Sequence, residues 1–275
     1  MCKVEVMLFH QVGIIKVREM KILKAFFSAS RTASKATTPE SPGLSETTAL
    51  LPWQDKGDLR TRVYSTYEEY RCHQASKLGK IRLEDYNERL QIELASRVTR
   101  IPEIMRGASV LCLGARMGPE CQSFIDCGAV AIGIDLNPGA SNRFVVTGDF
   151  HDIQYSDGSF DAVYTNALDH AFDLERVIAE TRRVLKPSGV FIAEIVRGSK
   201  DIGGREAGDF ESIWWEHVDA IISRIEQSGF AARSRERFDW PWGGDQVVFA
   251  KSDDQIEKDA VKWPRSFEPQ SPISK

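Results

Sequence analysis

Hydrophobic and polar positions divide the chain into short apolar runs and longer amphipathic stretches. Five apolar runs, rich in β-branched residues, follow one another between residues 109 and 196. Runs of this kind are typical of strands buried on both faces of a parallel sheet. The predicted strands are SVLCLG (109–114), AVAIGI (129–134), RFVVTG (143–148), FDAVYT (160–165) and GVFIAEIV (189–196).

Two stretches with the spacing of a helix lie between or after these apolar runs. Residues 173–189 carry apolar positions three and four apart, and Asp173 is the expected N-cap. Residues 209–230 show the same spacing and are expected to form one helix, with Trp214 and His217 on its apolar side. Both helices would cover the sheet.

Further elements are predicted before the first strand and after the last. A Ser65 cap with Glu68 three residues later predicts a helix, and a second helical pattern follows it up to Val98. Helices in this position can cover a ligand, and the first of them carries His73, Gln74 and Lys77. Two strand-like runs, 231–240 and 245–252, flank a PWGG turn and predict a closing hairpin.

The order of elements predicts an α/β fold: a Rossmann-like doubly wound sheet, mostly parallel with an antiparallel last strand, with helices on both faces. Four segments are expected. They are a flexible or targeting extension (1–60), a helical lid (61–105), the main domain (106–252) and a flexible tail (253–275). The Ser/Thr/Pro-rich stretch within the extension has little to bury and is typical of a linker.

Composition excludes some classes of protein. The net charge of −4 gives no general attraction to nucleic acids or anionic lipids, so neither is an expected partner. The five cysteines lack a Cys-x-x-Cys pair, which favours a reducing compartment without disulfides or zinc. The apolar run near the N-terminus is too short to span a bilayer. We expect a cytoplasmic protein, or an organellar one if the basic N-terminal segment is a leader.

Polar residues follow each of the first four predicted strands. Ligands of open α/β sheets bind beyond the carboxyl ends of the strands. Asp135 ends the second strand about twenty residues after the glycine turn, the spacing at which an acid binds ribose hydroxyls. The turn, GARMGPE, has Arg116 where a dinucleotide loop needs glycine, which disfavours NAD. A phosphate-free nucleoside cofactor is the remaining expectation.

The order of segments resembles the class I S-adenosylmethionine-dependent methyltransferases, especially the methyltransferase type 11 group. The resemblance covers about Val110 to Ala250, and it rests on VLCLGARMG, AIGIDLNPG, GDFHDIQYSDGSFDAVYTNALDHAFD and RVLKPSGVFIAEI. It implies S-adenosyl-L-methionine as the cofactor. The implied cofactor contacts are Gly114, Ala115, Arg116, Gly118, Glu120, Asp135, Leu136, Asp149, Phe150, Asn166 and Ala167.

By this resemblance, Gly114 faces the methionine part of the cofactor, Asp135 the ribose and Asp149 the adenine. The chain departs from the pattern at Cys112, where the family usually has an acid, and at Arg116, where it usually has glycine. Glu120 is expected either to replace the missing acid at the cofactor's amino group or to complement the positive end of a helix.

The acceptor side is predicted from aromatic and titratable residues. Asp169 and His170 follow the fourth strand, and histidine suits proton removal near neutrality; the alternative is that His170 only caps or packs the next helix. Trp215 and Trp242 are the predicted acceptor contacts. No Asn-Pro-Pro-Tyr run is present, which favours an oxygen rather than a nitrogen of a small molecule or glycan.

Two other classes of function stay open. A nicotinamide oxidoreductase shares the sheet and the ribose acid but needs the glycine-rich turn that this sequence lacks. A non-catalytic binding or scaffolding protein of the same fold is consistent with Cys112 and Arg116. The polar residues at four strand ends favour an enzyme, because a scaffold needs none of them there.

Overall fold

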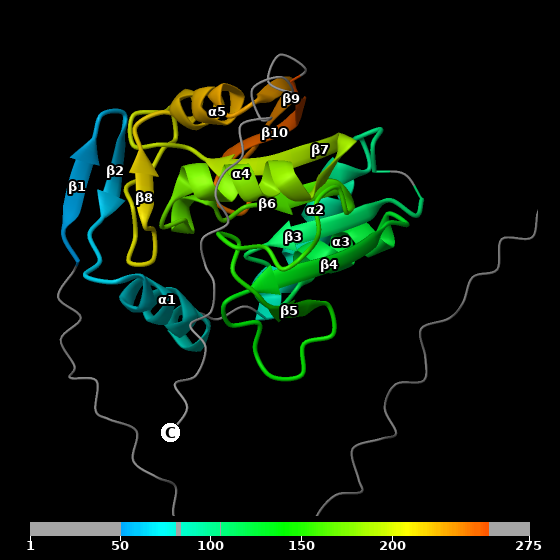
Figure 1. The fold of residues 1–275 in the computed structure, drawn as a ribbon, viewed down its shortest axis with the longest axis horizontal. Helices are drawn as coiled ribbons and strands as arrows, with labels where there is room; N and C mark the ends of the chain where they lie inside the picture. The colour runs from blue at the N-terminus through cyan, green and yellow to red at the C-terminus, as the bar shows by residue number, and fades with distance from the viewer. Residues whose placement is uncertain (1–50, 81–83, 105, 253–275) are drawn as a thin grey trace, which may run out of the picture. The chain divides into compact units, whose positions relative to one another are not determined.

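The computed structural model of the chain describes residues 51–80, 84–104 and 106–252 (Figure 1). Within them, one sheet contains β3 (Ser109–Leu113), β4 (Val130–Asp135), β5 (Val145–Thr147), β6 (Phe160–Thr165), β7 (Leu185–Val196), β9 (Phe230–Phe238) and β10 (Gly244–Lys251). The spatial order is β5-β4-β3-β6-β7-β10-β9. Along this order, the neighbouring strands from β5 through β4, β3 and β6 to β7 pair in parallel. Strand β10 is antiparallel to both of its neighbours, β7 and β9. The predicted sheet is confirmed.

Helices cover both faces of this sheet, as predicted. One face carries α2 (Glu84–Val98) and α3 (Pro119–Asp126), and the other carries α4 (Leu174–Val184) and α5 (Val218–Gln227). Alternate residues of β3 separate the two cores: Val110 and Cys112 pack with α2 and α3, whereas Leu111 and Leu113 pack with α4 and α5. Cys112 is fully buried, because it occupies a core position of the central strand.

A second, three-stranded sheet differs from the sequence prediction. It joins β1 (Trp53–Lys56), β2 (Leu59–Arg62) and β8 (Ile213–Trp215) in antiparallel order (Figure 1). Residues 53–56 and 59–60, which were expected to belong to a flexible or targeting extension, therefore form strands of this sheet. The helix expected over 209–230 starts only at Val218, because β2 pairs with residues 213–215 and holds them extended.

Residues 64–80, here called the lid segment, contain α1 (Tyr67–Ala75) and the 3₁₀ helix η1 (Ser76–Lys80). The predicted cap is displaced by one residue: Thr66, not Ser65, accepts a hydrogen bond from the Glu69 amide, at 3.1 Å. The Glu69 carboxylate in turn accepts from the amide of Ser65 at 2.5 Å, the residue before the cap, so the second bond of a capping box is displaced by one residue as well.

A buried ion pair ties α2 to the sheet. The guanidinium of Arg97 donates to both carboxylate oxygens of Glu194 on β7, at 2.8 and 3.2 Å, and both side chains are almost fully buried. Tyr164 and Gln246 donate to the same carboxylate at 3.0 and 2.9 Å. Every oxygen of Glu194 is therefore satisfied by hydrogen bonds.

The predicted extension as far as residue 50 and the predicted tail from 253 lie outside the described residues. The apolar run near the N-terminus and its targeting interpretation lie there too. Across the part of the chain that is described, none of the helices has both the length and the apolar character needed to cross a membrane.

Candidate functional site

A cavity of about 320 Å³ opens at the carboxyl ends of β3, β4, β5 and β6. Its size is within the range of small-molecule sites. The lid segment covers it and contributes Tyr70, Gln74, Lys77 and Leu78 to its walls. Most of the predicted site residues line it: Gly114, Arg116, Asp135, Leu136, Asp149, Phe150, Asn166, Ala167, Asp169, His170 and Trp242. The polar residues at successive strand ends thus meet in one place, as the fold predicts.

Four predicted site residues do not line the cavity. Ala115, Gly118 and Glu120 are buried and are not among the residues that line it. Trp215 was predicted as an acceptor contact, and this prediction is wrong. Its side chain is 2% exposed in β8, its ring stacks on Trp214, and its Nε1 donates to the Val196 carbonyl oxygen at 2.9 Å. The strand conformation of this segment places Trp215 in the core.

The turn after β3 owes its form to two residues with positive φ. Gly114 has φ 67°, and a Cβ on it would lie 2.8 Å from that of Ala167, so the ends of β3 and β6 approach too closely for a side chain. Arg116 has φ 43°, a conformation that favours glycine. What favours glycine at this position is therefore backbone conformation, because residues with a side chain rarely adopt this φ.

Hydrogen bonds hold Arg116 in this conformation. Its amide donates to Asp135 Oδ2 at 2.9 Å, and its carbonyl accepts from the Asn142 side chain at 2.9 Å. The guanidinium lies over the ring of Tyr86. The other oxygen of Asp135 accepts from the Asn137 amide at 2.8 Å. Asp135 therefore orders the loops after β3 and β4 and also lines the cavity.

Asp149 is held by a histidine and by the lid segment. Its Oδ1 accepts from the His151 ring at 2.8 Å, and its Oδ2 accepts from the Tyr67 hydroxyl at 2.6 Å. Burial acts to raise the pKa of Asp149, but the hydrogen bonds from His151 and Tyr67 outweigh it and lower the pKa. The other ring nitrogen of His151 accepts from the Phe172 amide, which fixes the orientation of the ring.

Glu120 is a buried carboxylate with an unused oxygen. Its Oε1 accepts from the side chain of Asn166 at 3.2 Å, whereas Oε2 is buried without a hydrogen-bond partner. Burial raises the pKa of Glu120 to about 7, although the charge of the nearby Arg116 acts to lower it. A cationic group bound beside Asn166 would satisfy this oxygen.

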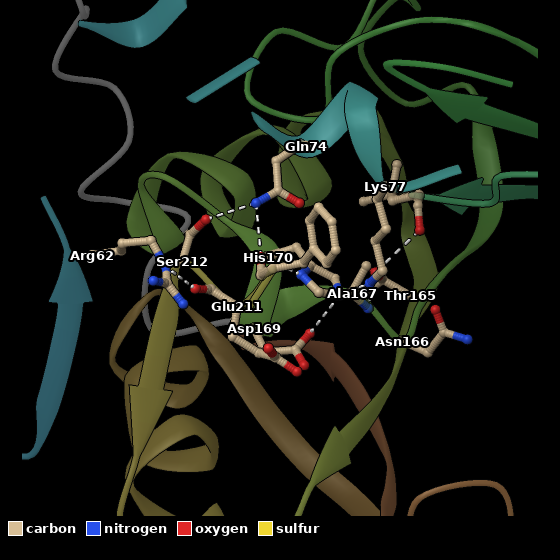
Figure 2. Close-up of polar contacts among 12 residues, drawn as sticks. Arg62, Gln74, Lys77, Thr165, Asn166, Ala167, Asp169, His170, Glu211 and Ser212 are labelled. Carbon is tan, nitrogen blue, oxygen red and sulfur yellow. Dashed lines mark hydrogen bonds and ion pairs between the residues drawn. The ribbon is translucent and has the colours of Figure 1, made fainter. Parts of the chain in front are cut away.

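At the other end of the cavity, the lid segment meets the loop after β6 (Figure 2). Lys77 Nζ lies 2.6 Å from His170 Nε2, and His170 Nδ1 lies 2.9 Å from the Phe210 carbonyl oxygen. Burial, followed by the charge of Lys77, lowers the pKa of His170 to about 3, so the ring is neutral near pH 7. Asp169 lies beside it, with an oxygen 3.8 Å from Nε2.

Sequence reasoning missed Arg205 and Glu211, which also line this end of the cavity. Arg205 donates to Glu211 at 2.9 Å and lies 4.8 Å from the centre of the Trp214 ring. Both residues belong to the loop between β7 and β8, whose polar sequence does not by itself indicate a site. The feature of the sequence that could have indicated them is their position in the loop after the fifth predicted strand, at the edge where ligands bind.

Arg62 of β2 holds the loop between β7 and β8 in place through hydrogen bonds to its backbone. Its buried guanidinium donates to the carbonyl oxygens of Glu211 and Gly208, at 2.8 and 2.7 Å, and lies over the ring of Trp53. The second sheet, which the sequence did not predict, thus supports the end of the cavity that Arg205 and Glu211 line.

Replacing Arg62 with methionine is expected to destabilise the protein by about 2 to 3 kcal/mol, because buried carbonyl groups lose charged donors. Amide exchange should rise most in residues 208–212. Arg60→Met is the control, since Arg60 pairs with the exposed Glu206 and should change stability by about 1 kcal/mol or less. Equal stability losses in the two variants would contradict this role of Arg62.

Comparison with known proteins agrees with the site. Residues 111–193 match the family model described as a methyltransferase domain. A sterol 24-C-methyltransferase of Gibberella zeae is 36% identical over 104 residues, which are 32% of this chain and 27% of that protein. An uncharacterized methyltransferase of Synechocystis is 25% identical over 171 residues, 56% of this chain and 80% of that protein. The chain therefore spans about a quarter of the length of the sterol methyltransferase.

The fold has a solved counterpart. The 1,6-didemethyltoxoflavin-N1-methyltransferase of Burkholderia thailandensis, solved with S-adenosylhomocysteine, superposes with a TM-score of 0.56 at 17% identity and covers 74% of this chain and all of its own. The sheet order, the cavity at its carboxyl edge and the family match define a Rossmann-like methyltransferase domain. Over residues 111–193 the chain is similar to a methyltransferase domain, and its fold is that of the Rossmann-like methyltransferases.

Proposed function

We propose that this protein transfers a methyl group from S-adenosylmethionine to an oxygen of a small molecule or glycan. The observation that supports this most is the convergence of Gly114, Asp135, Asp149 and Asn166, from four strand ends, on one cavity that also contains titratable groups at its far end. A non-catalytic scaffold has no need of such an arrangement.

The cofactor half of the proposal assigns one role to each group. Asp135 accepts hydrogen bonds from the ribose hydroxyls, and Asp149 with the backbone of Phe150 binds the adenine. Glu120, through its unused oxygen, binds the amino group. The remaining walls are lined by Gly114, Arg116, Leu136, Asn166 and Ala167. Ala115 and Gly118, buried in the same turn, would support this wall without lining it. The cofactor supplies a methyl group on a positively charged sulfur, so the protein must chiefly place the acceptor and exclude water.

The acceptor half lies under the lid segment. Asp169 and His170 form the polar end with Lys77, and Trp242 and Tyr86 form an aromatic wall. The named relatives are a sterol 24-C-methyltransferase and a 1,6-didemethyltoxoflavin-N1-methyltransferase. An oxygen acceptor for this chain is our proposal, and it is supported by the Lys77 amine at this end of the cavity, which can take up the proton of a hydroxyl.

The function is tested by calorimetric titration of the full-length protein with S-adenosylmethionine, S-adenosylhomocysteine and NAD. We expect binding of both sulfur nucleosides and none of NAD, followed by release of S-adenosylhomocysteine when hydroxyl compounds are screened as acceptors. A folded protein that binds none of the three would refute the proposal and favour a scaffolding protein. Binding of NAD instead would favour an oxidoreductase.

The role of Glu120 predicts proton release on binding. A bound ammonium group favours the ionised carboxylate, so near pH 6, below the raised pKa of about 7, S-adenosylhomocysteine should displace close to one proton. At about pH 8 Glu120 is already ionised and release should vanish. Titrations in two buffers of different ionisation enthalpy measure this number. Glu120→Gln should abolish release near pH 6; unchanged release in this variant would leave Glu120 a role only at the helix terminus.

A further inference from the structure

The Lys77 amine and the His170 ring form a hydrogen-bonded pair. The partners of the two ring nitrogens show which of them carries the proton. His170 Nδ1 lies 2.9 Å from a carbonyl oxygen, which only accepts, so this nitrogen carries the proton. Nε2 of the neutral ring is therefore an acceptor, and Lys77 Nζ donates to it at 2.6 Å. The lone pair of His170 Nε2 is occupied by this hydrogen bond, whereas the Lys77 amine also lines the cavity and can lose its proton more readily than the guanidinium groups there.

Charged groups around Lys77 come from several elements. The carboxylates of Asp169, Glu211 and Asp135 favour its ammonium form, and the guanidinium of Arg116 opposes it. Burial is the largest effect and lowers the pKa of Lys77 to about 8. Neutral amine is therefore present near physiological pH. The ammonium formed when the amine gains a proton lies near the Asp169 carboxylate, which favours it.

Aromatic side chains line the cavity on the side of this pair. They belong to Tyr70, Tyr86 and Trp242. Flat rings favour a planar acceptor, because stacked and edge-on aromatic contacts add to the burial of apolar area. Proton transfer is most efficient between groups of similar pKa. The pKa of the Lys77 amine is close to that of a hydroxyl on an unsaturated carbon. An aliphatic alcohol is far less acidic.

We propose that the acceptor is a planar compound with an acidic hydroxyl, a phenol or enol, and that Lys77 takes the proton of this hydroxyl. The O–H bond breaks, an N–H bond forms on Lys77, and the electron pair stays on the oxygen, which becomes the nucleophile. His170 is a positioning residue that holds the amine by accepting its hydrogen bond. This inference rests on the proposed function, whose acceptor class it narrows.

The test follows proton transfer directly and needs no turnover. The full-length protein is titrated with 4-nitrophenol, whose ionised form absorbs visible light, with and without S-adenosylhomocysteine, at a pH below the solution midpoint of the phenol. We expect bound nitrophenol to be ionised there in the wild type. In Lys77→Met the ratio of ionised to neutral phenol should fall at least about tenfold, which corresponds to one pKa unit.

Matched controls separate Lys77 from its surroundings. Lys80→Met removes the same charge from an exposed neighbour on η1 and should behave like the wild type. His170→Asn removes the Nε2 acceptor and should move the ionisation midpoint of bound nitrophenol toward its solution value. Unchanged binding of S-adenosylhomocysteine by Lys77→Met shows that this variant is folded.

The remaining outcomes distinguish failure of the proposed function from failure of the inference about the acceptor. Failure of the wild type to bind S-adenosylhomocysteine refutes the proposed function. Failure to bind nitrophenol, or binding of the neutral form only, overturns the inference, as does equal ionisation in Lys77→Met. Equally tight binding of 4-nitrobenzyl alcohol, which has the same ring and a non-acidic hydroxyl, would remove the acidity requirement and overturn the acceptor class.

Discussion

Replacement of Asp135 with alanine is expected to weaken the binding of S-adenosylhomocysteine by at least about a hundredfold. A hydrogen bond to a charged group contributes about 1.5 to 3 kcal/mol, and the proposed role gives Asp135 two of them. The same carboxylate accepts from the amides of Arg116 and Asn137, so its removal also loosens the loops after β3 and β4. Calorimetric titration measures the loss of affinity.

Two variants make this result interpretable. Asp135→Asn keeps the shape of the side chain but not its charge, and should fall between alanine and the wild type. Asp55→Ala removes an exposed acid of β1 and should bind like the wild type. If Asp135→Ala bound S-adenosylhomocysteine as tightly as the wild type does, Asp135 would have no part in recognising the ribose.

The largest effect on stability is expected from Arg97→Met. This change leaves the Glu194 carboxylate buried with only the neutral donors Tyr164 and Gln246. An uncompensated buried charge typically costs about 3 to 5 kcal/mol. Because Arg97 is the link between α2 and β7, we expect the midpoint of urea unfolding to fall strongly while the shape of the transition is preserved.

Arg100→Met is the matched control for this change. Arg100 is on the chain segment just after α2 and pairs with Glu236, but both side chains are about half exposed, at 58% and 49%. Exposed pairs contribute about 1 kcal/mol or less. A loss in Arg97→Met no greater than in Arg100→Met would mean that Glu194 is solvated or protonated in the folded protein.

The sequence predicted the parts of the fold that rest on local patterns. Strands such as Ser109–Leu113 are short, mainly apolar runs, and their order predicts the sheet and the edge at which its cavity opens. Asp173 indeed caps α4, where its side chain accepts from the Arg176 amide at 2.9 Å. Asp135 and Asn166 could be placed in the site because each directly follows such a strand.

What the sequence could not predict depends on contacts between distant segments. Residues 213–215 fit a helical stripe, yet their pairing with β2 makes them a strand and buries Trp215. Lys77 and His170 are separated by 93 positions, so no spacing rule indicates that they meet. The protonation of His170 follows from the Phe210 carbonyl, which is a further 40 positions away.

The lid segment touches both ends of the cavity. Tyr67 donates to Asp149 at the proposed adenine end, and Lys77, ten residues later, donates to His170 at the acceptor end. A cofactor or acceptor that replaces one of these two hydrogen bonds changes the free energy with which the lid segment is held in place. The other hydrogen bond depends on the same segment, so the second ligand meets a segment of changed stability. Cofactor and acceptor affinities should therefore be thermodynamically linked, with each ligand changing the affinity of the other by the same factor.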